Sequence, residues 1–556
     1  MHKWLMATLL VILGLPLAAQ DSDILPGHDL YHYLDRLDIR GYTGQAVYTQ
    51  LKPYGRQMAA EVFRRADTSA MSQPERDWHG RMHLLADDSL ALAAHTQGVL
   101  KVFYTNRRDL YALQQGSFTL IVNPFLHLAG GLDRGDPQYG FSAPMPVYTN
   151  TRGAVVRGQL GNRIGYYTEV TENVARVPRF VFGPYQRTQL LPGEGFVKPF
   201  GSENGLDWLN ARAYVTWRPN RFLRIKFGQD RALWGHGVQS LLLSDEAPPY
   251  LGLTLTARVW RLEYVSHLTQ MVDFIRDKDD KEGTYPRKYG AFHQLTYHVS
   301  PKVALSLFES VVYNPWTANG YRGFDLTYLN PIIFYRAAEQ YIGSPDNALL
   351  GLQGKANLLR HVQLYGQILI DDYNFSRRND GKQYWGNKTG VQAGLKYLDL
   401  FGIRTLDLQA EINQVRPYVY QHFNVTSAYS HYGQPLGHAL GGNTRDLHVI
   451  LRYRPLPALG GLLAYTQSLK GQNTAQVNYG GDLYVPDLNP AGEFDQAIGQ
   501  GDATRVQQLY GRLTWQLFHT DTYLEAEARY RRENTLQSVS FQVGLRAYIP
   551  GRMIKY

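Results

Sequence analysis

Aromatic side chains gather in two stretches of the chain, residues 414–445 and 470–506, together with several acidic side chains. A sugar ring is held by an aromatic face for stacking and by polar groups that hydrogen-bond its hydroxyls. Both kinds of group are present, so a carbohydrate site is one interpretation; packing of the loops against themselves, which also uses tyrosine, is the other. The candidate carbohydrate-binding rings are Tyr418, Tyr420, His422, Tyr429, His431, Tyr432, Tyr479 and Tyr484.

No combination of residues indicates catalysis. The sequence contains no His-Glu-x-x-His, no Gly-x-Ser-x-Gly and no P-loop lysine motif, the patterns of zinc proteases, serine hydrolases and phosphate-binding loops. Cysteine is absent, which excludes a thiolate metal site, a cysteine nucleophile and a disulfide framework. We therefore predict a protein that is not an enzyme, with no catalytic residue, metal or cofactor.

The acidic residues before Gly283 resemble a calcium loop. An EF-hand loop needs glycine at its sixth position and a bidentate glutamate at its twelfth. Counted from Asp277, these positions hold Glu282 and Lys288. Because a cation stands where the carboxylate is required, we predict a solvated loop.

The composition favours strands with one apolar and one polar face. The chain has 556 residues, of which 40 are Tyr and 44% are hydrophobic, yet its mean hydropathy is −0.35. A helical membrane protein would be far more apolar, whereas a membrane barrel alternates lipid-facing and lumen-facing residues. The formal charge of +9 is spread along the chain without a basic block, which argues against a nucleic-acid partner and favours anionic lipid or glycan.

Residues 1–20 have the layout of a secretory signal peptide. His2 and Lys3 supply the charged start, residues 5–17 form an apolar core, and Ala18-Ala19-Gln20 is a small-residue cleavage region. No later apolar run approaches the roughly eighteen residues of a membrane-spanning helix. The mature chain is therefore expected either to be soluble or to span a membrane as strands.

Residues 21–115 are predicted to form a small helical domain. Leu30, Leu34 and Leu37 lie at helical spacing, which places them on one face of a helix. Ser72 and Glu75 have the spacing of a capping box. Trp78, Met82 and Leu85 continue an apolar face after that box.

From about residue 118 the apolar period changes to two. One apolar face opposite a face that carries both charge signs is typical of a transmembrane β-strand. Segment 521–532 shows it clearly, with Leu524 and Tyr530 on one face and Glu525 and Arg531 on the other. The same pattern recurs near 221–229, 259–268, 361–371, 403–413, 446–454, 508–517 and 538–548.

Connection lengths favour a barrel over a soluble sandwich. Short links such as 219–220 alternate with long ones such as 230–249, as periplasmic turns alternate with external loops in outer-membrane barrels. We predict an all-β transmembrane barrel of about eighteen antiparallel strands over residues 116–556, with both ends of the barrel on the periplasmic side. A strand pair at 322–338 would raise the count to twenty.

The predicted luminal face carries charges of both signs. A salt-bridge network that fills the barrel is one interpretation, and a charged pore is the other. The residues concerned are Arg224, Lys226, Arg261, Glu263, Asp407, Glu411, Arg452, Arg512, Glu525, Arg529, Arg531 and Arg546.

Two stretches carry a family resemblance. One begins Trp234-Gly235-His236-Gly237 and continues to Pro249; the other runs from Tyr328 to Gln340 and is followed by residues 346–351 and 363–367. Segments 28–31 and 51–54 add to it. Over most of its mature length the chain resembles the capsule-assembly Wzi family of outer-membrane proteins.

The resemblance implies an eighteen-stranded barrel with a helical bundle at its periplasmic end and a lectin-like role in attaching or assembling capsular or surface polysaccharide. The motif loop adds Trp234 and His236 to the candidate carbohydrate contacts. The other expected partners are outer-membrane lipid and, during insertion, the barrel assembly machinery. An outer-membrane channel and a component of a gliding-motility or secretion assembly are the alternatives.

Overall fold

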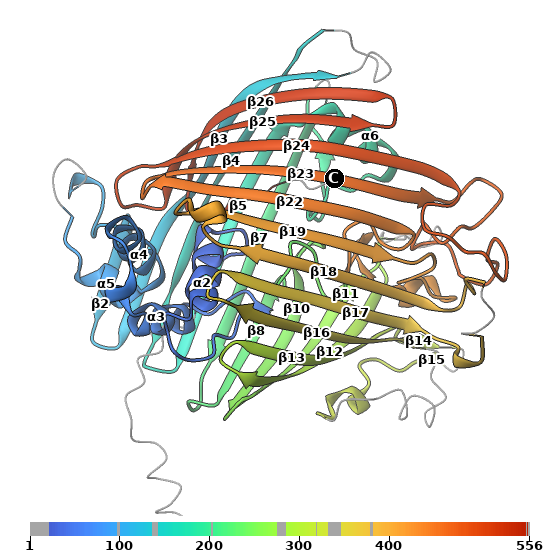
Figure 1. Cartoon of the computed structure of the whole chain (residues 1–556), viewed down its shortest axis with the longest axis horizontal. Coiled ribbons are helices and arrows are strands. Elements are labelled where there is room, and N and C mark those ends of the chain that lie inside the picture. Colours follow the sequence, from blue (N-terminus) through green and yellow to red (C-terminus); the bar gives the residue numbers. More distant parts are fainter. Residues whose placement is uncertain are drawn as a thin grey trace, which may run out of the picture.

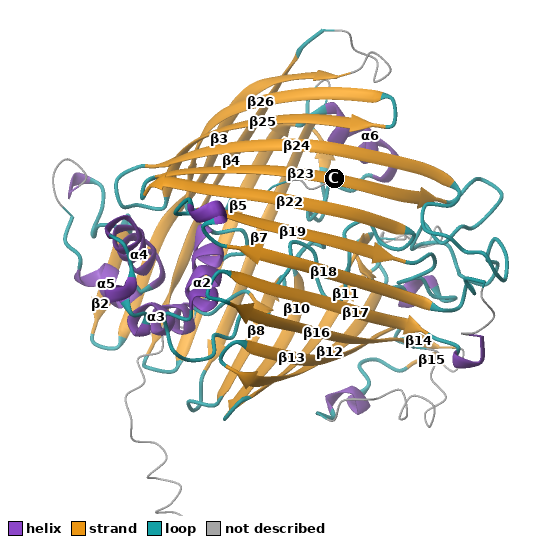
Figure 2. Ribbon diagram, in the orientation of Figure 1, coloured by secondary structure: helices purple, strands orange, loops and turns teal. Residues whose placement is uncertain are grey.

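In the computed structural model, a closed wall of antiparallel strands carries a helical unit at one end and long loops at the other (Figure 1). The structure describes residues 22–96, 101–135, 143–201, 204–274, 285–317, 320–331, 346–377, 382–551 and 553. The predicted signal peptide and the acidic loop at 277–283 lie outside these residues. Figure 2 shows the separation of the helices around α2–α5 from the loops at the opposite end.

The barrel strands follow chain order around the wall, and β3 (Phe118–Gly135) closes the ring by pairing with β26 (Leu536–Ala547). Short β2 (Tyr111–Gln115) pairs with β3, and β6 (Lys198–Pro199) pairs with β7. The other wall strands are β4 (Met145–Leu160), β5 (Ile164–Arg176), β7 (Gly205–Trp217), β8 (Leu223–Asp230), β10 (Tyr250–Val259), β11 (Leu262–Val272), β12 (Arg287–Ser300), β13 (Val303–Tyr313), β16 (Asn347–Leu358), β17 (Val362–Asp372), β18 (Lys388–Tyr397), β19 (Leu406–Val415), β22 (Thr444–Leu456), β23 (Leu459–Gln472), β24 (Asp502–Gln516) and β25 (Thr522–Glu533).

The wall contains eighteen strands, as predicted. β13 pairs directly with β16, from Val303↔Ala356 to Val312↔Asn347, so the alternative of a further strand pair at 322–338 is wrong. The connection instead holds the hairpin β14 (Trp316–Thr317) and β15 (Gly320–Tyr321) and the 3-10 turn η4 (Leu326–Leu329). Residues 332–345 of the second motif stretch lie outside the described part.

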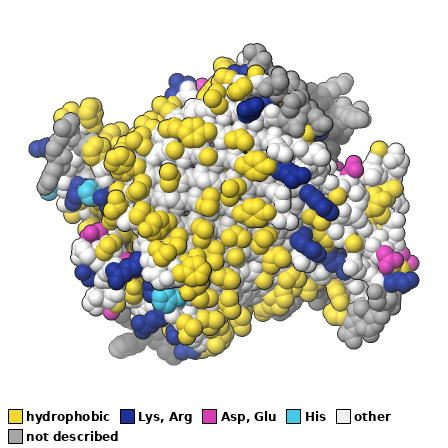
Figure 3. Space-filling model, turned by 45° about the horizontal axis from the view of Figure 1, so that its top comes forward, with side chains coloured by type: hydrophobic (Ala, Val, Ile, Leu, Met, Phe, Trp, Pro, Cys, Tyr) yellow, Lys and Arg dark blue, Asp and Glu magenta, His cyan; other side chains and the backbone are white. Residues whose placement is uncertain are grey.

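Strand alternation separates the two faces of the wall as expected. On β25, Leu524 and Tyr530 are exposed, whereas Glu525 and Arg531 are buried in the interior. Hydrophobic side chains cover the outside of the barrel between the helical end and the loops (Figure 3). Outward apolar residues on other strands include Leu132, Val170, Leu209, Phe227, Leu305, Leu352, Ile368, Val391, Leu463, Leu513, Phe541 and Val543.

Exposed aromatic rings gather beside the short turns, at the helical end of the barrel. Such a belt is typical of strands that leave a bilayer at the headgroup level. Its members are Trp217, Phe222, Trp260, Tyr297, Phe401, Tyr453, Trp515 and Phe518. In the part of the chain that the structure describes, no helix has the length and apolarity to cross a membrane.

The helical unit forms its own apolar core. Leu30, Leu34 and Leu37 are buried against Trp78 and Met82, which confirms the predicted helical faces. Its elements are α2 (Asp29–Arg40), α3 (Arg56–Arg65), η1 (Thr68–Ala70), α4 (Gln73–Ala86) and α5 (Asp88–Ala93), with the two-residue strand β1 (Leu51–Lys52) between α2 and α3.

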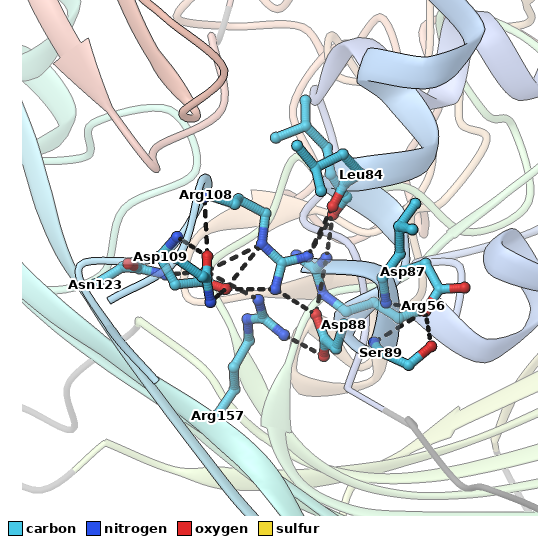
Figure 4. Close-up of polar contacts among 12 residues, drawn as sticks. Arg56, Leu84, Asp87, Asp88, Ser89, Arg108, Asp109, Asn123 and Arg157 are labelled. Atoms are coloured by element: carbon cyan, nitrogen blue, oxygen red, sulfur yellow. Dashed lines mark hydrogen bonds and ion pairs between the residues drawn. The ribbon is translucent and has the colours of Figure 1, made fainter. Parts of the chain in front are cut away.

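A buried ion cluster joins this unit to the wall (Figure 4). Arg157 of β4 pairs with Asp88 at the start of α5, and Arg108 pairs with Asp88 and Asp109 at 2.7 Å each. Asn123 of β3 donates to Asp109 at 2.8 Å. Burial alone would raise the pKa of Asp88, but Arg157, Arg108 and Arg56 hold it well below its usual range.

Helix α2 and the segment before it supply charged partners to the luminal wall. The carboxylates of Asp23, Asp35 and Asp38 meet Lys226, Lys396 and Lys355 at 2.5–2.7 Å. Arg36 pairs with Asp407 at 2.5 Å. These contacts support the salt-bridge interpretation of the luminal charges on this side of the barrel.

One residue of the predicted luminal set lies elsewhere. Arg261 is exposed in the turn between β10 and β11, where it donates to the carbonyl of Val299 at 3.1 Å. The predicted strand pattern extended across this turn, whereas β10 ends at Val259 and β11 begins at Leu262.

Candidate functional site

The motif loop between β8 and β10 folds into the barrel. Its strand β9 (Leu233–Trp234) pairs with β1 of the helical unit, with Leu51 opposite Trp234. Trp234 is 3% exposed and lies edge-on to Phe308 at 5.8 Å between ring centroids. Gly235 has φ +151°, and a Cβ there would lie 2.5 Å from the Gln367 side chain, so the loop needs glycine to approach the wall this closely.

His236 lies in the same buried loop. Burial, together with the charges of Lys355 and Lys396, holds its pKa well below its usual value. The imidazole is therefore neutral at pH 7. Trp234 and His236 are buried inside the barrel. Their contact with a carbohydrate stays a prediction.

Three of the predicted tyrosines join the loops to one another. Tyr418, Tyr420 and Tyr429 are 0% exposed. The Tyr420 hydroxyl donates to the carbonyl of Leu241 at 2.7 Å, and the Tyr429 hydroxyl donates to that of Leu242. Their rings stack at 5.5 Å. Since a ring without an open face cannot stack on a sugar, these rings pack the loops in the arrangement described here.

His431 and Tyr432 are also buried. Burial lowers the pKa of His431 to about 3, and its Nδ1 accepts from the Val272 amide at 3.2 Å. Tyr432 packs against Phe274 and Tyr285, with ring centroids 5.3 Å apart in each case. These contacts fix the 416–443 loop to the β11–β12 connection.

Three predicted rings are partly exposed: His422, Tyr479 and Tyr484. His422 lies tilted against Phe423, with ring centroids 4.2 Å apart, and Phe423 is exposed. The hydroxyl of Tyr484 donates to Ser430 at 3.2 Å. Of the predicted set, these three rings are the ones that are not fully buried, and Tyr484 also packs against the large apolar core.

The structure adds exposed rings that the sequence reasoning did not select. Trp316 and Tyr321 are 63% and 56% exposed, with ring centroids 4.9 Å apart on the β14–β15 hairpin. Phe375 is exposed beside Tyr373 at 4.8 Å. Both pairs lie in links already recognised as long and external, so loop length together with aromatic pairs close in sequence was the signal that could have found them.

Inside the barrel, the two halves of the lumen are filled differently. The packed half, from β8 to β19, holds the motif loop and a large apolar core that includes Leu241–Leu243, Phe292 and Leu369. The cavity half, from β22 through β26 and β3 to β7, borders a cavity of about 990 Å³. Its lining contains thirteen Lys or Arg side chains and nine Asp or Glu side chains.

Several of the lining charges are paired. Arg212 meets Glu169 at 2.6 Å, and Arg546 meets Glu525 at 2.8 Å. The residues described in the structure include no group of three or more His, Asp or Glu side chains arranged to hold a metal ion. The lining side chains can form hydrogen bonds and ion pairs and can contact an aromatic or sugar ring.

A sequence model of the family described as capsule assembly protein Wzi matches residues 209–535, more than half of the chain. The chain belongs to the Wzi capsule assembly family. The match runs from β7 through β25 and includes the motif loop, so the Wzi sequence pattern coincides with the wall and the interior core. As a Wzi barrel, the protein resides in the outer membrane.

A solved structure has the same fold. The chain is similar to Wzi of Escherichia coli, described as an outer membrane protein involved in group 1 capsule assembly and a carbohydrate-binding β-barrel; the TM-score is 0.56 at 14% identity, covering 96% of this chain and 100% of that one. OpdL and OprD of Pseudomonas aeruginosa each give a TM-score of 0.39 at 10% and 9% identity, covering 76% of this chain and 98% and 92% of theirs. No curated protein sequence matches.

Proposed function

We propose that this Wzi-family barrel is a non-catalytic, lectin-like protein that holds surface or capsular polysaccharide at the outside of the outer membrane. The family supports a role in capsule assembly, and the similar Escherichia coli protein is described as carbohydrate binding. The observation that carries the proposal is the set of exposed ring pairs on the external loops, of which Trp316 and Tyr321 are the most open.

These ring pairs suit a polysaccharide because sugars stack on aromatic faces while polar edges remain free for hydrogen bonds. Tyr373 and Phe375, and His422 and Phe423, form further pairs on neighbouring loops. Tyr479 and Tyr484, both partly exposed, complete the proposed surface. The buried rings Trp234, His236, Tyr418, Tyr420, Tyr429, His431 and Tyr432 are proposed to hold the loops that present it.

The outer wall has its own proposed partners. The apolar band and the aromatic belt suit contact with outer-membrane lipid. Strand β26, which ends at Ala547 and closes the ring against β3, is proposed to be the strand through which the barrel assembly machinery inserts the chain.

Binding of the purified protein to polysaccharide extracted from the surface of its source cells tests the proposal. Trp316→Ala with Tyr321→Ala should weaken binding by about tenfold or more, because each stacked ring contributes roughly 0.5–1.5 kcal/mol beyond area burial. Trp260→Ala is the matched control, since Trp260 is at least as exposed but lies in a turn at the helical end. Equal binding by wild type and the double variant would remove this hairpin from the site.

A further inference from the structure

The cavity half of the lumen contains guanidinium groups that form no direct ion pair with an acidic side chain of the described residues. Arg452, Arg512 and Arg529 line the cavity from β22, β24 and β25. None of the three forms an ion pair with a carboxylate of the described residues, although Arg454, Arg531 and Arg546 nearby each do. Nη1 of Arg512 and Nε of Arg529 are buried and have no hydrogen-bond partner among the described residues.

The strand register brings these groups together. Arg452 and Arg512 both lie opposite Leu462 of β23, one on each side, so their backbones are about 10 Å apart at the usual strand spacing. Arg529 lies opposite Tyr510, two residues from Arg512, which is a diagonal neighbour at roughly 7–8 Å. Three cations on β22, β24 and β25 therefore face one volume. Glu527 of β25 faces the same volume opposite Arg512, where its carboxylate accepts from the Tyr510 hydroxyl.

An apolar floor lies between the cations. Ile450, Ala464 and Tyr510 form a small buried cluster with Leu462 at its edge. The guanidinium of Arg529 lies over the rings of Tyr510 and Phe180 at 5.2 and 5.1 Å. Arg452 has a neutral neighbour, the Gln409 amide oxygen at 3.2 Å. An apolar surface with cations beside it suits a sugar ring that carries an anionic substituent.

The cavity extends toward the outside of the cell. At that end its lining includes the exposed residues Arg187 and Thr188 of α6 (Arg179–Thr188). At the other end it meets His28 and Asp29 of the helical unit and the tail at Ile549–Gly551, which follows β26 into the lumen. A ligand that enters past α6 therefore reaches the three arginines without crossing the packed half.

We propose that this cavity binds the anionic groups, carboxylate or phosphate, of an acidic glycan, with Arg452, Arg512 and Arg529 as the anion-binding residues. The inference rests on the proposed lectin-like function and names the substrate class. The excess of cations over acids in the lining gives a positive field, and a buried guanidinium without a partner gains most from a charge-assisted hydrogen bond. Neutral sugars gain neither.

Calorimetric titration of the purified barrel with trigalacturonic acid, maltotriose and inorganic phosphate tests the proposal. Trigalacturonic acid should bind, and more weakly at high salt, whereas maltotriose should not compete with it. The double variant Arg452→Gln with Arg512→Gln should lose at least tenfold in affinity. Arg512→Lys keeps the charge and should retain most of the binding. Competition by phosphate only at much higher concentration would mark the glycan, rather than free phosphate, as the ligand.

Arg505→Gln is the matched control, because Arg505 lies on the same strand β24 but is exposed. Different migration of boiled and unboiled samples on gels verifies that each variant is a folded barrel. Equal affinity of wild type and the double variant for trigalacturonic acid, or binding of phosphate without trigalacturonic acid, would overturn the inference. The rim variants at Trp316 and Tyr321 report separately on the proposed function, so failure of one does not imply failure of the other.

Discussion

The packed half and the cavity half of the lumen are built from the same kind of strand, but the first is filled with side chains and the second borders a cavity. Both halves turn charged side chains inward through period-two alternation. In the packed half Asp23, Asp35 and Asp38 of the N-terminal segment meet the wall lysines. In the cavity half Arg454 pairs with Asp29 of the same segment, whereas Arg452 and Arg512 form no ion pair with any described residue. Whether a luminal charge forms a structural ion pair or stays available to a ligand therefore depends on which side chains of a distant segment contact it.

The largest effect on stability should follow from removing one partner of a buried ion cluster in the packed half. Arg36 is buried and pairs with Asp407, Asp399 and Glu75. Removing one partner leaves buried carboxylates uncompensated, so Arg36→Met should lower the free energy of unfolding of the helical unit by about 3–5 kcal/mol. Faster hydrogen exchange in α2–α4 would report this loss. Arg512→Met in the cavity half should leave that exchange unchanged.

Acid should loosen the helical unit. Burial between Tyr33 and Phe63, with repulsion from His83, lowers the pKa of His79 from 6.5 to about 4. The unfolded chain therefore binds the proton first, and stability present above pH 6.5 is lost as the pH falls toward 4, with no further loss from this group below. At 1.36 kcal/mol per pKa unit, the loss is about 3 kcal/mol.

The measurement is hydrogen exchange of α3 and α4 between pH 7 and 4, corrected for the intrinsic pH dependence of exchange. His79→Phe should flatten this profile, while exchange of the wall strands should not change. A profile in which His79→Phe retains the full acid sensitivity would remove His79 as its cause.

The hydroxyls that hold the loops should give a smaller effect. Tyr429→Phe keeps the ring but leaves the carbonyl of Leu242 without its buried donor, which costs about 1–3 kcal/mol. Thermal unfolding of the purified barrel measures the change. Tyr321→Phe, on an exposed ring of the external hairpin, is the matched control and should unfold like wild type; equal effects of both would show that the buried bond contributes nothing.

The smallest effect on stability is expected at the exposed β14–β15 hairpin. Trp316→Ala removes an exposed ring, so the free energy of unfolding should change by less than about 0.5 kcal/mol, while polysaccharide binding falls. Thermal unfolding and binding are measured on the same sample. A large loss of stability would mean that Trp316 supports the loop layer instead of presenting a face to the glycan.

The wall was predictable because its signal is local. Alternation such as Leu524 against Glu525 depends on neighbouring residues, and link lengths follow from where alternation stops. Whether each loop tyrosine is buried or exposed could not be predicted in this way. Tyr420 and Leu241 meet across 179 positions of sequence, so nothing near Tyr420 distinguishes a ring that binds sugar from one that packs a loop.

The cavity could not be predicted from the sequence for the same reason. Lys355 and Arg512 are both inward cations on alternating strands. The path of the N-terminal segment brings Asp38 within 2.5 Å of Lys355, whereas Arg512 forms no direct ion pair with a described residue. Exposed pairs such as Trp316 and Tyr321 could have been selected from the sequence, because they lie close together in a link of recognised length.

The most direct test of the division of the lumen compares two buried serines in a chain that has no cysteine. Ser468 of β23 lines the cavity. Ser306 of β13 lies in the packed half, where its hydroxyl forms a hydrogen bond of 2.8 Å with the hydroxyl of Thr296. The two serines are 3% and 4% exposed. Ser468→Cys and Ser306→Cys are treated with small thiol reagents in the purified, folded barrel. We expect Ser468→Cys to react, faster with an anionic than with a cationic reagent of equal size, and Ser306→Cys to stay unreactive. Equal reaction at both positions, or no preference for the anionic reagent at Ser468→Cys, would contradict a lumen that is packed on one side and lined with an excess of cations on the other.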